Sequence, residues 1–125
     1  MELEWTLLVP LRIPVDKNGT PLALLDEFAE NENAMFFLWK DHAAAAEADE
    51  INKLFRNNSE NDYTKYQGDY SAEWYWAKIL YAVRHDEAIR QAAYTWEEHC
   101  DWMTGILCGG NKTGENLPQC VCSWS

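Results

Sequence analysis

Apolar and polar residues alternate at the start of the chain. From Leu3 to Val15 every odd-numbered position is apolar, and polar residues such as Arg12 lie at even positions. A period of two residues is the pattern of a β-strand with one face in the core. Because Pro10 and Pro14 cannot donate to a ladder, we expect this strand to lie at a sheet edge, to bend, or to be split in two. The residues Asp16–Gly19 then predict a turn.

The next two segments are shorter. Thr20 followed by Pro21 is typical of an N-cap and a first helical residue, which predicts a short helix to about Glu30. The apolar run from Ala34 to Trp39 does not alternate, so it fits either a strand buried on both faces or the start of a helix. We expect a strand here.

Three longer segments have helical patterns. Four consecutive alanines lie in the first, over residues 41–56, and alanine has the highest helix propensity. The second, over 71–84, has Ser71 as its expected cap. The third is expected over 85–107, because apolar residues recur there at alternating spacings of four and three. These apolar residues are Ile89, Ala93, Trp96, Cys100, Met103 and Leu107. The polar stretch 57–69 predicts a loop.

Together these elements predict a helix-dominated α+β fold. The N-terminal strand, possibly paired with a strand over 34–39, packs on three or four helices. A chain of 125 residues and 14.5 kDa has a common single-domain size. We therefore expect one domain over residues 1–125.

The composition combines an acidic excess with many core-forming residues. The chain has 21 Asp and Glu against 10 Lys and Arg, a formal charge of −11, and 47% hydrophobic residues. That hydrophobic content can support a folded core, which excludes a disordered acidic chain. The charge disfavours direct binding to nucleic acids or anionic membranes, because phosphate binding depends on Lys and Arg. It favours association with basic surfaces.

The N-terminus and the cysteines point to a compartment. Residues Met1-Glu2-Leu3-Glu4 carry acids where a secretory signal would carry bases, so we expect a cytoplasmic protein with reduced thiols. Disulfides to the C-terminal tail, or a zinc site in which His99 or Cys100 joins the three later cysteines, are the alternatives. An intact helix would hold residues 100 and 108 about 12 Å apart, too far for either. The four cysteines are Cys100, Cys108, Cys120 and Cys122.

No catalytic motif stands out from the background. The densest titratable group is Glu97, Glu98 and Asp101 beside His99, and carboxylates at helical spacing can serve acid–base chemistry. A di-iron site of the helix-bundle type needs Glu-x-x-His on two helices, and that spacing does not occur in this sequence. We therefore expect a solvated polar face, with no enzymatic activity, no cofactor and no bound metal.

The carboxylates could instead form a binding surface. Averaged over the folded surface, the charge density is about sixfold below that of duplex DNA. A strongly acidic surface therefore requires that the acids of residues 47–50 and those of residues 86–101 lie on the same side of the protein. An exposed aromatic residue beside them would act as an anchor. The expected partner-binding residues are Glu47, Asp49, Glu50, Asp86, Glu87, Glu97, Glu98, Asp101 and Trp76.

The function predicted from these features is a non-enzymatic inhibitor that occupies the basic, nucleic-acid-binding surface of a partner protein. Small acidic proteins from phages or mobile elements act in this way, as DNA mimics, on nucleases and on restriction or CRISPR machinery. One alternative is an immunity or antitoxin-like protein that neutralises a basic toxin. Another is a small metal-binding domain built on Cys108, Cys120, Cys122 and His99.

Overall fold

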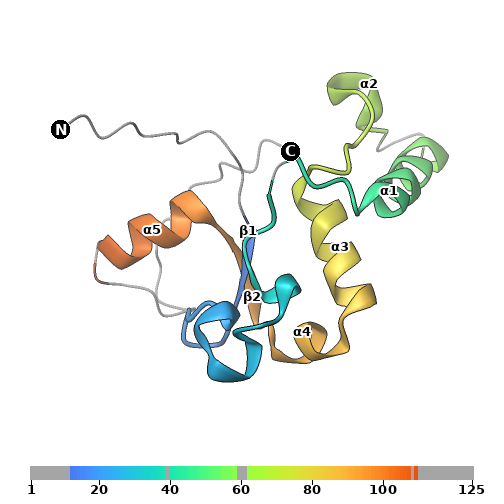
Figure 1. Cartoon of the computed structure of the whole chain (residues 1–125). Helices are drawn as coiled ribbons and strands as arrows, with labels where there is room; N and C mark the ends of the chain where they lie inside the picture. Colours follow the sequence, from blue (N-terminus) through green and yellow to red (C-terminus); the bar gives the residue numbers. More distant parts are fainter. Residues whose placement is uncertain (1–11, 39, 59–61, 108, 110–125) are drawn as a thin grey trace.

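The computed structural model describes residues 12–38, 40–58, 62–107 and 109 (Figure 1). Two strands and five α-helices in this part of the chain confirm the helix-dominated α+β fold. The strands are β1 (Arg12–Val15) and β2 (Thr95–Glu98). The α-helices are α1 (Ala45–Asn57), α2 (Thr64–Gln67), α3 (Tyr75–His85), α4 (Glu87–Ala92) and α5 (His99–Leu107). Three short 3-10 helices are η1 (Leu22–Leu24), η2 (Asp26–Phe28) and η3 (Glu32–Ala34).

The two strands pair antiparallel, with Arg12 opposite Glu98 and Val15 opposite Thr95. Besides this pairing β1 makes two isolated bridges, between Arg12 and Phe37 and between Val15 and Pro21. All four β1 residues are buried. The predicted N-terminal strand is confirmed for these residues, and residues 3–11 lie outside the described part.

Over residues 34–38 the predicted strand is replaced by the end of a 3-10 turn and the bridge between Phe37 and Arg12, and residue 39 lies outside the described part. The side chain of Asn31 accepts a hydrogen bond of 2.8 Å from the backbone N–H of Asn33, which caps η3 at its first turn. Phe37 then donates its backbone N–H to the carbonyl of Arg12 at 3.1 Å. Side-chain capping, which a count of apolar residues does not detect, therefore fixes the start of η3.

The second strand overturns the longest predicted helix. The segment over 85–107 forms three elements, α4, β2 and α5, although its apolar residues follow helical spacing. Thr95 and Trp96 have side chains that favour strands, and the backbone N–H of Tyr94 already bonds the carbonyl of Val15 at 2.8 Å. Pairing with a distant strand therefore overrode the local helical pattern.

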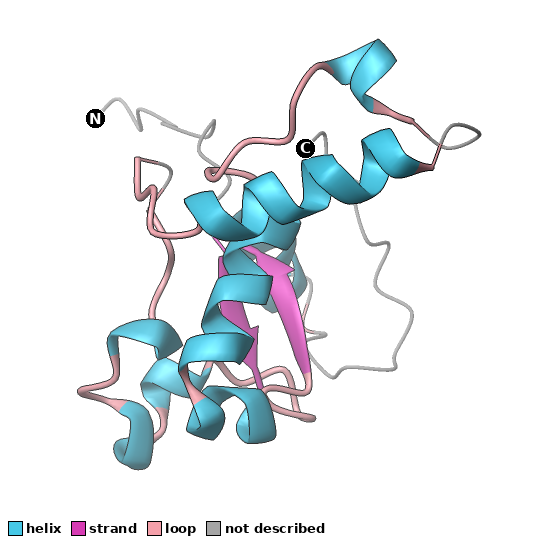
Figure 2. Cartoon of the chain, turned by 90° about the vertical axis from the view of Figure 1, so that its right-hand side faces the viewer, coloured by secondary structure: helices cyan, strands magenta, loops and turns pink. Residues whose placement is uncertain are grey.

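The strands lie between helices, with α1, α3 and α4 on one side and α5 on the other (Figures 1 and 2). Two apolar clusters fill the interior. One joins the 3-10 helices to α4, and the other lies between α1 and α3. The first contains Leu22, Phe28, Ala34 and Ile89, and the second Ala44, Ala48, Tyr70 and Ala77.

The turn after β1 is confirmed. Oδ1 of Asp16 accepts hydrogen bonds of 2.8 Å from the backbone N–H groups of Asn18 and Thr20, and Gly19 adopts φ 76°, a conformation that favours glycine. The helix predicted after Thr20 is two 3-10 turns, and its cap residue is Pro21, without a side-chain cap. Thr20 is engaged in the preceding turn.

The two other predicted helices are confirmed with later starts, as α1 and α3. The predicted loop over 57–69 contains the single turn α2. The predicted start of a helix at residues 85–86 is confirmed, since Asp86 is the N-cap of α4. None of the described helices is long and apolar enough to cross a membrane.

Candidate functional site

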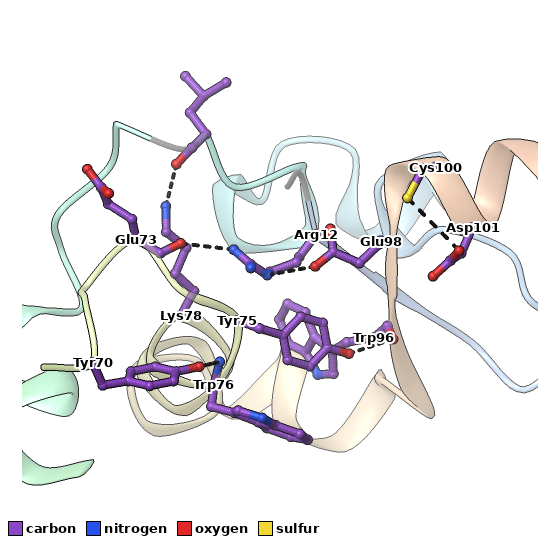
Figure 3. Close-up of polar contacts among 11 residues, drawn as sticks. Arg12, Tyr70, Glu73, Tyr75, Trp76, Lys78, Trp96, Glu98, Cys100 and Asp101 are labelled. Atoms are coloured by element: carbon purple, nitrogen blue, oxygen red, sulfur yellow. Dashed lines mark hydrogen bonds and ion pairs between the residues drawn. The ribbon is translucent and has the colours of Figure 1, made fainter. Parts of the chain in front are cut away.

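A buried polar centre lies where β1, β2 and the start of α3 meet (Figure 3). Arg12 on β1 has an exposed fraction of 0%. Its Nη1 donates a hydrogen bond of 2.9 Å to the carbonyl oxygen of Glu73, and its Nε lies 3.3 Å from Oε1 of Glu98. The guanidinium carbon lies 5.1 Å from the centre of the Tyr75 ring, within the range of cation–π attraction. One side chain thus joins three elements that are far apart in the sequence.

Lys78, in α3, is the second buried cation of this centre, with an exposed fraction of 1%. Its Nζ donates a hydrogen bond to the carbonyl oxygen of Leu38. Burial lowers the pKa of Lys78, Asp41 opposes this shift, and Arg12 adds to it. The lysine holds the backbone at Leu38 against α3. We use the term buried polar centre for Arg12, Glu73, Tyr75, Lys78 and Glu98.

Glu98 is the buried carboxylate of the centre. Burial raises its pKa, and the neighbouring Arg12 offsets part of that rise. Removing one partner of a buried ion pair leaves the other charge without compensation, which costs more than the intact pair contributes. The polar centre therefore makes the strand pair dependent on both Arg12 and Glu98.

Two tyrosines hold the backbone around the centre. The hydroxyl of Tyr75 donates a hydrogen bond of 2.9 Å to the carbonyl oxygen of Trp96, and burial raises its pKa to about 12. The hydroxyl of Tyr70 accepts a hydrogen bond of 2.8 Å from the backbone N–H of Trp76, in the first turn of α3, where N–H groups lack helical partners. Both phenols lie at the N-terminal end of α3.

The backbone that follows Leu38 presents polar groups close to the buried cations. The backbone N–H of Asp41 donates to the carbonyl of Leu38 at 3.1 Å. Nε2 of His42 lies 3.4 Å from Oε1 of Glu73, and the imidazole is mostly exposed. A carboxylate and an imidazole can accept and donate hydrogen bonds to hydroxyl groups. This is the chemistry available to a ligand at the rim of the polar centre.

The acids predicted on α1 are partly neutralised within the chain. Glu50 accepts two hydrogen bonds from Arg84 on α3, of 2.7 and 3.1 Å. Glu47 is buried, and its Oε1 lies 3.9 Å from Nη1 of the same arginine. Asp49 is exposed. Glu47 and Glu50 thus share one cation of the same chain, Arg84.

The acids at the start of α4 also have internal partners. The side chain of Asp86 accepts hydrogen bonds from the backbone N–H of Ile89 at 3.0 Å and from the amides of Asn31 and Asn33 at 2.8 and 3.2 Å. Burial alone would raise the pKa of Asp86, but these hydrogen bonds lower it overall. Glu87 makes an exposed ion pair of 2.6 Å with Arg90 on the same helix.

The last predicted group lies at the junction of β2 and α5. Burial raises the pKa of both Glu97 and Asp101, and Glu98 belongs to the polar centre. Trp76 is 60% exposed on α3 and contacts Tyr75 edge-on. The structure joins the α1 acids to a cation on α3 and Glu98 to a cation on β1, rather than joining the two acidic groups. A partner-binding role for these residues stays a prediction.

Neither buried cation is predicted from the sequence. Arg12 was counted as a residue on the polar face of the strand. For Lys78 a signal was available, since it lies four residues after Trp74 and three before Tyr81. Both neighbours pack against the α1–α3 cluster, so helical spacing places Lys78 on the buried side.

The metal hypothesis falls mostly on residues that the structure does not describe. Cys108, Cys120 and Cys122 lie outside the described residues. Cys100 is partly buried, with its Sγ 4.0 Å from Oδ1 of Asp101. Within the described ranges, no group of three or more His, Cys, Asp or Glu side chains could hold a metal ion.

Comparison with known proteins changes the functional picture. No protein-family model matches the chain. It is 52% identical over 111 residues to ribulokinase of Vibrio parahaemolyticus, covering 88% of this chain and 19% of that enzyme. It is 35% identical over 100 residues to ribulokinase of Bacillus licheniformis, covering 80% of this chain and 18% of the enzyme. With ribulokinase of Mycolicibacterium smegmatis, the identity is 39% over 97 residues, covering 78% and 17%. The chain spans about one fifth of the length of these relatives.

These similarities contradict the function predicted from composition. A chain that is 52% identical over 111 residues to an enzyme named ribulokinase is not explained as a non-enzymatic inhibitor from a phage. The predictions of a basic nucleic-acid-binding partner, of DNA mimicry and of a protein that is not an enzyme are therefore wrong. Net charge reports how a protein interacts with charged surfaces and carries no information about its reaction.

Proposed function

We propose that this chain is part of a ribulokinase-type sugar kinase, an enzyme that phosphorylates ribulose. The observation that supports this is the 52% identity over 111 residues to the Vibrio parahaemolyticus enzyme. The matches in Bacillus licheniformis and Mycolicibacterium smegmatis support the same assignment. Because the matched segment is about one fifth of each relative, the activity is proposed for the whole enzyme, to which this segment contributes.

The proposed contribution of the segment is to position groups. Kinases accelerate phosphoryl transfer mainly by positioning the reactants and by electrostatic stabilisation, and both require supports with fixed side chains. The buried polar centre has this property: Arg12 binds the backbone before α3, and Lys78 binds the carbonyl of Leu38. Asp41 and His42 lie three and four residues after Leu38 and are the polar groups we propose to face the sugar site.

The test is a graft. The matching segment of Vibrio parahaemolyticus ribulokinase is replaced by this chain, and ATP-dependent phosphorylation of ribulose is measured. The expected kcat/KM is within about tenfold of the parent enzyme, a loss of less than about 1.4 kcal/mol in transition-state stabilisation. A graft that is soluble and folded but has less than about one hundredth of the parent's kcat/KM would contradict the proposal.

A matched pair of variants then tests the positioning role. In the graft, His42→Ala is expected to reduce kcat/KM for ribulose, because it removes a hydrogen-bonding group beside the polar centre. His85→Ala is the control, since His85 is an exposed histidine at the end of α3 that stacks on Tyr81. Equal activity of the two variants would remove the Asp41–His42 segment from the sugar site.

A further inference from the structure

Helix α5 has more apolar surface than the described chain covers. Its sequence, His-Cys-Asp-Trp-Met-Thr-Gly-Ile-Leu, has three polar residues in nine. The side of α5 that contacts the body carries His99, Trp102 and Gly105, spaced by three. The rings of His99 and Trp102 lie 5.3 and 6.2 Å from the ring of Phe36, and Gly105 is buried.

The side chain of Leu107 points away from this contact. At about 100° per residue, Leu107 lies about 140° around the helix from Trp102. Leu107 is 74% exposed and Ile106 is 44% exposed. A helix that is apolar on most of its circumference belongs inside a large protein or a membrane, and α5 is too short to cross a membrane.

Two further apolar side chains are exposed in the segment that contains Phe36. Met35 and Leu38 flank the Phe36–Phe37 pair in the sequence and are 43% and 55% exposed. We use the term α5 apolar surface for Ile106 and Leu107. Exposed apolar side chains at the end of a mostly apolar helix are typical of a surface that another part of a protein covers.

The similarity to ribulokinases identifies the occupant. The matched segment is 19% of the Vibrio parahaemolyticus enzyme, so about four fifths of that enzyme lies outside it and must pack against its counterpart. We propose that the α5 apolar surface is the interface on which the remainder of a ribulokinase-type polypeptide docks, through an apolar surface of its own. This inference rests on the proposed function, and it makes α5 an internal helix of the whole enzyme.

The test compares the effect of one substitution in two proteins, the 125-residue chain and the graft. In the 125-residue chain, Leu107→Glu is expected to leave the urea unfolding midpoint unchanged, because the side chain is already exposed. In the graft described above, the same substitution is expected to lower the thermal midpoint by about 5 °C or more, because it places a carboxylate in an apolar interface. Leu107→Met in the graft is expected to retain the parent midpoint.

The matched control is Tyr66→Glu, at a residue of α2 that is 89% exposed. We expect it to leave the unfolding midpoints of both the 125-residue chain and the graft unchanged. Equal midpoints for Leu107→Glu and Tyr66→Glu in the graft would overturn the inference. A graft that is stable but inactive, yet still destabilised by Leu107→Glu, would support the interface and contradict the proposed function.

A second measurement addresses self-association. Light scattering of the 125-residue chain after size-exclusion chromatography is expected to give a monomer mass. A dimer that Leu107→Glu converts to monomer would show that a second copy covers the surface, and would overturn the assignment to the rest of a kinase. A graft that fails to fold before any substitution would contradict both proposals.

Discussion

The α1–α3 pair and the strand pair with α5 are stabilised in different ways. Between α1 and α3 the buried apolar residues are small or aromatic, such as Ala44, Ala48 and Tyr70, and the acids Glu47 and Glu50 pair with the half-exposed Arg84. Between β1, β2 and α3 the interior contains full charges. The helical pair therefore depends on apolar packing, whereas the strand pair depends on compensation between buried charges.

The difference shows how a chain with an excess of acid builds its interior. Most exposed acids tolerate loss of a partner, because water solvates them. Water does not solvate Glu98, Arg12 and Lys78 in this way, because each of these side chains is buried. Four predictions, ordered by expected size, test this contrast.

The largest effect is expected for Arg12→Met, which leaves Glu98 buried without its cation. We expect a loss of about 3–5 kcal/mol in the free energy of unfolding, measured by urea denaturation of the 125-residue chain. The double variant R12M/E98Q should recover part of this loss, because the orphaned charge is gone. A single variant as stable as the parent would show that the pair does not compensate charge.

The next effect tests the link between α1 and the residues before α3. The side-chain amide of Asn52 donates a hydrogen bond of 2.9 Å to the carbonyl of Tyr70 and accepts one of 2.6 Å from its N–H. Asn52→Ala is expected to cost about 2–3 kcal/mol, because both backbone groups stay buried and lose a partner. Asn57→Ala, at the exposed end of α1, is the control and should cost less than about 0.5 kcal/mol.

A smaller effect is expected at the cap of α4. Asp86→Ala should cost about 1–2 kcal/mol, with Asp86→Asn closer to the parent. Since the folded pKa of Asp86 is lowered, its contribution is present above its unfolded pKa of about 3.9 and is lost as the pH falls through the folded value. Urea midpoints from pH 7 to pH 3 should therefore converge for Asp86→Ala and the parent. Midpoints that stay parallel would exclude this role for the ionised carboxylate.

The smallest effect has the opposite pH dependence. The folded pKa of Glu97 is raised, first by burial and then by Asp101, so folding favours the protonated acid. Its unfavourable contribution is absent below the unfolded pKa of about 4.3 and develops as the pH rises through the folded value. Glu97→Gln should therefore be more stable than the parent at pH 7 and equal to it at pH 3.5. Glu87→Gln, at an exposed acid with a lowered pKa, should not gain stability at pH 7.

An element can be predicted from the sequence when the interactions that decide it reach only a few residues along the chain. The turn at Asp16 was predictable because its hydrogen bonds reach residues two and four positions away. The helix cap at Asp86 was predictable for the same reason, since it bonds the N–H of Ile89. The strand β2 was not, because its partner β1 lies about 80 residues earlier in the chain, with Arg12 opposite Glu98.

The candidate site was less predictable than the fold. Carboxylates at Glu47 and Glu50 were expected to be available to a partner, and the structure instead directs both to Arg84. The cations that form the polar centre were not selected, because a charged residue is rarely fully buried and sequence patterns assign it to the surface. A helical-spacing count around Lys78 would have been the one local signal of its burial.

The sequence by itself determined the fold class, the Asp16 turn, the cores of helices α1 and α3 and the cap of α4, because neighbouring residues decide these through backbone propensity and short-range hydrogen bonds. Only the tertiary structure decided that residues 95–98 form a strand, that Arg12 and Lys78 are buried, and which face of α5 contacts the body. These outcomes depend on groups that approach each other across 40 or more residues, as the hydrogen bonds from Lys78 to Leu38 and from Arg12 to Glu73 show. The local pattern of apolar and polar residues does not show which charges compensate each other when they are buried together.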